Sequence, residues 1–354
     1  MIKVTVPGKL FIAGEYAVIN SGYSAILMAV NRFLDITIIQ SDITTINSKG
    51  YLDNIQLKRE KNELIIDETS YLKNYLLQAL RLSEKYLILK GHKLVDYEIN
   101  VKSNLTSEAG EKLGLGSSGA VTVGIIEAVL KFYQVQYDNL LLFKLAVLAQ
   151  GEISKKGSFA DLAVIISSGI IRYTTFNKDF VFNYYQEHGL LDVLAINWPL
   201  LEIEVIRTSF KLNFIVGWTK TPASTRELIK KITTKKSLKV YQQFLEASDQ
   251  LVSKIETALI ENDEPLFYSM ISLNRRLLKN LSGGIETTKL KTLIEIVERY
   301  GVAKVSGAGG GDCGIGFIKD TKNKDIIIRK WLQADIVFLD LEIYEKGEND
   351  EQKR

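Results

Sequence analysis

Two adjacent serines, Ser117 and Ser118, lie within a glycine-rich run at 114–119, directly before a stretch whose apolar residues recur at helical spacing. The glycines allow tight turns and the close approach of a ligand, and the serine hydroxyls can bind an anion or its metal ion. The unpaired N–H groups and positive dipole end of the following helix favour negative charge. This segment is therefore predicted to hold phosphate groups.

Two further glycine-bearing segments, 7–16 (PGKLFIAGEY) and 306–314 (SGAGGGDCG), lie near the two ends of the chain. The runs 114–119 and 309–314 each spell G-x-G-x-x-G, but neither stands in the strand–helix–strand context of a dinucleotide site. The sequence contains no G-x-x-x-x-G-K-[ST] phosphate loop, and no V-A-I-K strand follows the glycine-rich run as it does in protein kinases. Together the three segments indicate a nucleotide-dependent enzyme of another type.

The composition is that of a globular protein without a broad charged surface. Of 354 residues, 46% are hydrophobic and 25% are charged, and the formal net charge is +3. This balance argues against nucleic acid or an anionic membrane as the partner. Cys313 is the single cysteine, which excludes an intrachain disulfide and a multi-cysteine zinc site. We find no signal-peptide core or membrane-spanning stretch and expect a cytoplasmic protein, a monomer or a homodimer.

Helix and strand patterns are mixed along the chain, and its length favours two domains. Strands are predicted at 3–5, 33–40, 97–101, 169–176, 202–206, 213–217, 303–305, 314–318 and 335–344. Helices are predicted at 70–89, 118–132, 142–150, 237–260, 265–281 and 287–298. We expect an α+β fold with an N-terminal domain at 1–200, a C-terminal domain of helices over a small antiparallel sheet at 201–346, and a charged tail at 347–354.

The three glycine-bearing segments resemble, in their order and placement, the three motifs of the GHMP kinase superfamily. The matching runs are PGKLFIAGEY at 7–16, GLGSSGA at 114–120 and SGAGGGDCG at 306–314. Within that superfamily, similarity to bacterial phosphomevalonate kinases is carried by GEY at 14–16, KGSFADLA at 156–163 and GWTKTPAST at 217–225.

The resemblance implies transfer of the γ-phosphoryl group of ATP, with Mg²⁺, to 5-phosphomevalonate, giving 5-diphosphomevalonate in the mevalonate pathway of isoprenoid biosynthesis. It also implies a ribosomal-protein-like N-terminal domain and a ferredoxin-like C-terminal domain. ATP binding is assigned to Lys112, Gly114, Leu115, Gly116, Ser117, Ser118 and Gly119. Acceptor binding is assigned to Lys9, Tyr16, Ser158, Asp161, Lys220, Ser224, Thr225, Gly309 and Gly310. Lys9 and Asp161 are assigned to catalysis, and Ser118 to the metal ion.

The chemistry of Lys9 and Asp161 can be argued from their types. Phosphoryl transfer needs aligned reactants and positive charge near the transferring group, which Lys9 and Mg²⁺ would supply. A phosphate monoester, with a second pKa of about 6, is mostly deprotonated at pH 7 and needs no strong base. Asp161 is therefore predicted to orient Lys9 or to relay a proton, whereas an alcohol acceptor would require it as a general base. A purely structural alternative is that Asp161 caps the helix that begins near Leu162.

Several residues depart from the family pattern, and for others the sequence allows two roles. Glu111 and Lys112 stand where the second motif commonly has a proline, and Glu152 is a weak candidate for the metal-binding glutamate of related kinases. Asp312 is interpreted either as a metal-side acid or as a turn residue. Ser224 and Thr225 are predicted to begin a helix and, by resemblance, to contact the acceptor's phosphate; these roles are compatible.

The sequence leaves two other functions open. One is a neighbouring member of the superfamily, a mevalonate kinase or a diphosphomevalonate decarboxylase. The other is a non-catalytic ligand sensor that has the same fold. The GEY run and the segment around Trp218 favour the phosphomevalonate kinases, and the presence of Lys9, Ser118 and Asp161 argues against a sensor.

Overall fold

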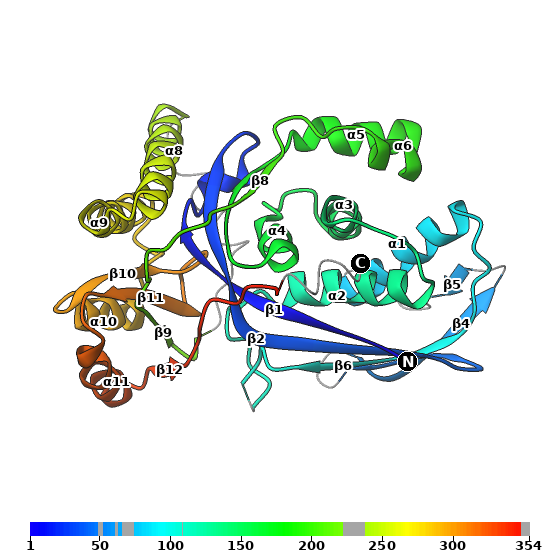
Figure 1. Cartoon of the computed structure of the whole chain (residues 1–354), viewed down its shortest axis with the longest axis horizontal. Helices are drawn as coiled ribbons and strands as arrows, with labels where there is room; N and C mark the ends of the chain where they lie inside the picture. Colours follow the sequence, from blue (N-terminus) through cyan, green and yellow to red (C-terminus); the bar gives the residue numbers. More distant parts are fainter. Residues whose placement is uncertain (49–51, 61–62, 66–73, 108, 222–237, 348–354) are drawn as a thin grey trace.

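The computed structural model of this protein describes residues 1–48, 52–60, 63–65, 74–107, 109–221 and 238–347. In these residues the chain forms an eight-stranded and a four-stranded sheet with helices packed against them. Figure 1 shows the two parts side by side, with the smaller sheet and its helices on the left of the view. No helix in the described ranges is both long enough and apolar enough to cross a membrane.

The larger sheet is built around two long antiparallel strands, β1 (Ile2–Ala13) and β2 (Ser24–Gln40). Its other strands are β3 (Thr44–Ser48), β4 (Leu52–Glu60), β5 (Glu63–Ile65), β6 (Tyr97–Ser103), β7 (Ile170–Thr174) and β8 (Glu202–Val205). They follow the order β5-β4-β3-β6-β2-β7-β8, and β1 pairs with β2. The predicted strands at 3–5 and 33–40 are confirmed as parts of longer ones, while β3, β4 and β5 were not predicted.

Helices cover one face of this sheet (Figure 1). They are α1 (Tyr75–Leu89), α2 (Ser117–Phe132), α3 (Asn139–Gly151) and α4 (Ala160–Ser167). α2 and α4 contact β1 and β2 directly, and α1 and α3 pack against α2. Since every residue from 119 to 130 is buried, α2 is a core helix that places its first turn at the glycine-rich run. The helices predicted from 118 and at 142–150 are confirmed.

Two helices, α5 (Lys178–His188) and α6 (Leu190–Ala195), follow β7 and were not predicted. In α5 the only buried residues are the neighbours Val181 and Phe182. Tyr184 and Tyr185 are partly buried against the core as well, three and four positions after Val181, so the helical repeat was present in this short segment but was not recognised.

The smaller sheet has the order β10-β11-β9-β12, with all neighbours antiparallel. Its strands are β9 (Phe214–Trp218), β10 (Gly301–Val305), β11 (Cys313–Ile318) and β12 (Val337–Leu339). Its helices are α8 (Leu238–Ile260), α9 (Glu264–Leu281), α10 (Thr288–Val297) and α11 (Lys324–Gln333). This arrangement confirms the predicted helices over a small antiparallel sheet.

The predicted strand at 335–344 is wrong over most of its length, because only β12 pairs with β9. Beyond β12 the chain returns to the larger sheet: the N–H of Asn31 donates to the C=O of Glu342, and that of Tyr344 to Ala29. The helix α11 was missed because its three consecutive isoleucines resemble a strand.

The predicted domain boundary after residue 200 stays a prediction. The larger sheet continues through β8 to Val205, and the smaller sheet begins with β9 at Phe214. The tail at 347–354 lies almost entirely outside the described residues.

Candidate active site

Lys9 lies in the middle of β1, where the strand is irregular on both sides. The pairing register with β2 shifts before Gly8 and again after Phe11. Such bulges redirect side chains and commonly flank functional sites. The backbone N–H of Lys9 donates to the C=O of Leu115 at 2.9 Å, and its Nζ donates to the C=O of Gly114 at 3.2 Å. Both main chain and side chain of Lys9 are thus tied to the glycine-rich run.

The Lys9 residue is only 9% exposed, and the acids Asp161 and Asp312 lie near enough to act on the charge of its ammonium. Burial lowers the pKa of Lys9, and the negative charges of Asp161 and then Asp312 oppose that shift. Lys9 therefore belongs to a buried cluster of opposite charges. Most lysines on a strand are instead exposed at the protein surface.

Gly114 and Gly116 are required by backbone conformation and by space. Their φ angles are 76° and 85°, a region that residues with a Cβ rarely adopt. A Cβ on Gly114 would lie 2.6 Å from Cβ of Asp312, and a Cβ on Gly116 would lie 2.8 Å from Cγ of Lys9. The glycines of the run thus make room for two charged residues of the site.

The first turn of α2 presents backbone donors at this point. Gly116 occupies the N-cap position in a left-handed conformation, and no side chain of the described residues caps this end. The first N–H groups of a helix have no partner inside the helix, so they favour an anion. Ser117 is 6% exposed and Ser118 is partly exposed, and both line the cavity described below.

Asp161 faces this turn from the first turn of α4. A Cβ on Gly119 would lie 2.6 Å from Oδ2 of Asp161, so the carboxylate approaches α2 closely. Burial raises the pKa of Asp161, while Lys9 and the backbone N–H groups of Leu162 and Asp161 itself oppose the shift. The N-cap of α4 is Phe159, with a left-handed φ of 61°, so Asp161 is not the capping residue.

The third glycine-bearing segment is held against β1 and the residues after it. Ser306 Oγ accepts a hydrogen bond from the N–H of Phe11 at 2.9 Å and donates to its C=O at 3.2 Å. The hydroxyl of Tyr16, which precedes the short 3-10 helix Ala17–Ile19, donates to the C=O of Ala308. These bonds join the two domains over the Lys9 side chain.

A buried ion pair between Glu15 and Lys304 strengthens the same junction. The two residues are 2% and 0% exposed. Lys304 Nζ also donates to the C=O of Val305 at 2.7 Å, and the N–H of Gly307 donates to Glu15 Oε1 at 3.4 Å. Burial lowers the pKa of Lys304, and the Glu15 carboxylate opposes that shift.

Together these segments enclose a cavity of about 380 Å³ between the two domains. The predicted site residues that line it are Lys9, Tyr16, Lys112, Gly114, Gly116, Ser117, Ser118, Ser158 and Asp161. Glu15, Lys156 and Ser306, which were not assigned to the site from sequence, also line it, and so does Asp312, for which the sequence left two interpretations open. The three sequence motifs and the 156–163 segment therefore meet at one place.

Other predicted residues do not line this cavity. Leu115 is fully buried and contributes its C=O to Lys9, and Gly119 makes room for Asp161. Lys220 forms an ion pair with Asp335 at 2.5 Å on the surface of the smaller domain. Ser224 and Thr225 lie outside the described residues.

Gly309 and Gly310 pack against Ile285 and are not among the residues that line the cavity. A Cβ on Gly309 would lie 2.4 Å from the Ile285 carbonyl oxygen, and the N–H of Gly310 donates to that oxygen at 2.8 Å. Because these glycines are needed for packing within the smaller domain, the cavity-facing part of their segment is Ser306 to Ala308. The number of glycines in the sequence could not show which of them contact a ligand and which allow packing within the smaller domain.

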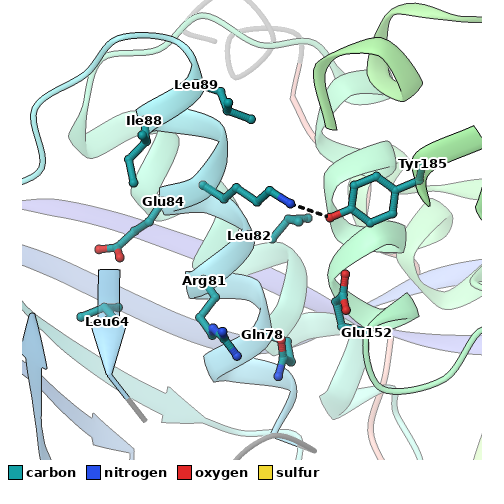
Figure 2. Close-up of a pocket in the computed structure, with 10 residues that line it drawn as sticks. Leu64, Gln78, Arg81, Leu82, Glu84, Ile88, Leu89, Glu152 and Tyr185 are labelled. Atoms are coloured by element: carbon teal, nitrogen blue, oxygen red, sulfur yellow. Dashed lines mark hydrogen bonds between the residues drawn. The ribbon is translucent and has the colours of Figure 1, made fainter. Parts of the chain in front are cut away.

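A second cavity, of about 530 Å³, lies between α1, β5 and the ends of α3 and α5 (Figure 2). Glu152 lines this cavity and not the one around Lys9, which corrects its candidacy as a metal ligand beside Ser118. Gln78 and Arg81 on α1 offer polar groups to it, and Leu82 offers an apolar wall. Opposite α1, Tyr185 accepts a hydrogen bond from the Lys85 ammonium at 3.3 Å.

The donor atoms around the Lys9 cavity fit a magnesium ion that is shared with phosphate groups. Ser118, Asp161 and Asp312 supply a hydroxyl and two carboxylates, and Mg²⁺ prefers oxygen ligands. In the part of the chain that the structure describes, no three His, Cys, Asp or Glu side chains form a metal-holding group. Mg²⁺ bound together with phosphate groups needs only one or two protein carboxylates, so Ser118 with Asp161 or Asp312 would be enough to hold it.

Comparisons with known proteins agree with this geometry. Residues 74–169 match the family model of the GHMP kinases N terminal domain, and residues 255–336 match that of the GHMP kinases C terminal region. A phosphomevalonate kinase from Streptomyces sp. (strain CL190) is 33% identical over 95% of each chain. A mevalonate kinase from Methanocaldococcus jannaschii is 27% identical over 92% of this chain and 94% of its own.

Among solved structures, the phosphomevalonate kinase of Streptococcus pneumoniae in complex with phosphomevalonate and AMPPNP superposes with a TM-score of 0.88. It is 29% identical, and the match covers 97% of this chain and 100% of that one. Since both domain models match in order and a 33% identical relative aligns along almost the whole length, this chain belongs to the GHMP kinase family.

Proposed function

We propose that this GHMP kinase transfers the γ-phosphoryl group of ATP to 5-phosphomevalonate, with Mg²⁺ as cofactor. The observation that carries the proposal is the convergence of Lys9, Asp161 and the first turn of α2 on one cavity between the domains. The choice of acceptor is supported by the 33% identical phosphomevalonate kinase and by the solved complex named above.

The nucleotide phosphates are proposed to lie against the first turn of α2. Ser117, Ser118 and the backbone N–H groups that follow Gly116 would bind the β- and γ-phosphates. Ser118, with Asp161 or Asp312, would hold the magnesium ion, whose charge offsets the negative charge on the phosphates when it is bound.

The nucleoside is proposed to extend into the cavity of Figure 2. Both α1 and α3, which border that cavity, pack against α2. Gln150, in the last turn of α3, donates to Thr122 at 3.3 Å, and Thr122 donates to the C=O of Ser118 at 2.9 Å, so α3 is tied to the first turn of α2. A volume of about 530 Å³ is ample for a nucleoside.

The acceptor is proposed to occupy the remainder of the Lys9 cavity. Its phosphate oxygen attacks the γ-phosphorus, the bond from that phosphorus to the β,γ-bridging oxygen breaks, and ADP leaves. Lys9 would stabilise the charge on the transferring group, and Asp161 would hold the Lys9 ammonium in place. The acceptor carries a second anionic group, its carboxylate, and Lys156 is a further cation on the cavity wall.

A coupled assay for ADP release tests the proposal directly. Mevalonate, 5-phosphomevalonate and 5-diphosphomevalonate are supplied in parallel with ATP and Mg²⁺, and carbon dioxide is measured in the same reactions. ADP from 5-phosphomevalonate alone supports the proposal. Turnover of mevalonate alone would instead assign a mevalonate kinase, carbon dioxide from 5-diphosphomevalonate a decarboxylase, and no turnover a ligand sensor.

A further inference from the structure

Glu15 is a buried acid of the cavity wall to which the proposed mechanism gives no role. It follows Gly14, whose φ of 89° sets a tight bend, and precedes Tyr16, whose φ is also positive at 65°. Strained conformations of this kind persist where the surroundings fix them, and they cluster at functional sites. Here the bend directs the Glu15 side chain into the junction between the domains, where it is 2% exposed.

The two carboxylate oxygens of Glu15 have different surroundings. Oε1 accepts hydrogen bonds from the ammonium of Lys304 and, at 3.4 Å, from the N–H of Gly307. Oε2 is buried and has no hydrogen-bond partner within the residues that the structure describes. Most buried polar atoms of native proteins have a partner, and an unpaired charged one is costly. Because Glu15 lines the Lys9 cavity, a small shift of its side chain toward that cavity would bring Oε2 to a donor on a bound molecule.

The chemistry of a carboxylate limits what that donor can be. An ionised carboxylate accepts hydrogen bonds and cannot donate them, so it repels phosphate and carboxylate groups. Of the groups on 5-phosphomevalonate, only the tertiary hydroxyl, between the carboxylate and phosphate ends, carries a hydrogen that Oε2 can accept.

We propose that Oε2 of Glu15 accepts a hydrogen bond from the tertiary hydroxyl of the acceptor, while Oε1 holds Lys304 and Gly307. This inference rests on the proposed function and adds a residue that sets acceptor specificity. Glu15 then links the junction between the domains to acceptor recognition, since the same side chain touches the third glycine-bearing segment and the substrate. A site that pairs a substrate hydroxyl in this way discriminates strongly against an analogue that lacks it.

The experiment compares 5-phosphomevalonate with an analogue in which hydrogen replaces the tertiary hydroxyl. We expect the wild-type protein to show kcat/KM at least about 10-fold lower for the analogue, because the analogue leaves Oε2 buried and unpaired. The double variant Glu15→Leu, Lys304→Met removes both charges together. Its kcat/KM values for 5-phosphomevalonate and for the analogue should agree within about 3-fold, because the carboxylate that distinguishes them is gone. The KM for ATP is measured in every case.

Ser306→Ala is the matched control, because it removes a different bond between β1 and the same segment and leaves the carboxylate in place. It should keep the wild-type ratio between the two acceptors. Equal kcat/KM values in the wild-type protein would overturn the inference, and this arm needs no variant to fold. A wild-type ratio that survives in the double variant would overturn it as well, since the hydroxyl would then be recognised by another residue or by water. Absence of turnover with 5-phosphomevalonate would instead reject the proposed function.

Discussion

The side chain of Lys9 occupies the space that any side chain at Gly116 would need. A Cβ at position 116 would lie 2.8 Å from Cγ and 3.0 Å from Cε of Lys9. These residues come from different motifs, one in β1 and one at the start of α2. The absence of a Cβ at Gly116 is thus what lets the lysine reach across the glycine-rich turn at the start of α2.

Gly116→Ala should therefore displace the Lys9 ammonium in addition to straining the backbone. We expect kcat to fall about 100-fold, comparable to losing one positioned charge-stabilising group. Gly110→Ala is the matched control, because Gly110 has a similar φ of 83° but nothing within 4 Å of an added Cβ. Steady-state kinetics and thermal unfolding of both variants separate displacement from strain. Equal loss of activity in the two variants would refute the steric link.

Lys9→Ala should lower kcat by about 10²- to 10³-fold, because the transferring group loses a preorganised positive charge. Lys3→Ala is the control on the same strand, since Lys3 pairs with Asp35 at the surface, with 57% of its side chain exposed. Single-turnover kinetics with saturating substrates measure the chemical step in both variants. A Lys9→Ala variant with near-normal turnover would exclude Lys9 from the reaction.

Protonation of Asp161 should contribute to the decrease in kcat at low pH. Burial raises its pKa, so the carboxylate is lost as pH falls through a value above the ordinary range for Asp. In Asp161→Asn that titration disappears. The decrease in kcat that remains at low pH should then reflect protonation of the acceptor phosphate, whose pKa is about 6. We expect kcat to fall about 10- to 100-fold if Asp161 only orients Lys9. Loss of all turnover at every pH, with fold and substrate affinities intact, would identify an obligatory general base.

Lys304→Met should destabilise the protein by about 3–5 kcal/mol, because it leaves the Glu15 carboxylate buried without its cation. The double variant Glu15→Leu, Lys304→Met should recover most of that loss, since a well-packed apolar pair needs no compensating charge. Urea unfolding followed by fluorescence measures both variants. If the single and double variants unfolded at the same urea concentration, the ion pair would contribute little to the junction.

Lys156 and Lys220 allow a direct comparison of a lysine that lines the proposed acceptor cavity with one that does not. Lys156 lines the Lys9 cavity, whereas Lys220 pairs with the exposed Asp335 and does not line it. Lys156→Ala should raise the KM for the acceptor about 10-fold with little effect on the KM for ATP, as expected for a lost charge-assisted contact. Lys220→Ala should leave both constants close to wild type. The opposite ranking would restore Lys220 to the binding site.

The parts of the site that sequence could predict are those encoded within one segment. The glycine-rich run at 114–119 leads into a helix pattern, so the residue order alone was enough to place a glycine-rich turn at the start of α2. The long helices of the smaller domain were equally readable, because their apolar stripes repeat at helical spacing.

The parts that sequence could not predict depend on distant partners. Glu15 and Lys304 are 289 positions apart, and neither stands out until the fold brings them together. Gly309 and Gly310 were assigned to the acceptor by resemblance, and their packing against Ile285 could not be read from the number of glycines in the run. The stretch after Leu339 alternates like a strand, yet its hydrogen bonds go to β2 in the larger domain.

The most direct test of the account is a structure of this protein with a non-hydrolysable ATP analogue and 5-phosphomevalonate bound. The account predicts the β- and γ-phosphates within hydrogen-bond distance of Ser117, Ser118 and the N–H groups at the start of α2. It also predicts the acceptor phosphate beside Lys9. Phosphates bound elsewhere, with the turn at Gly116 and the Lys9 ammonium left without contact to either ligand, would contradict it.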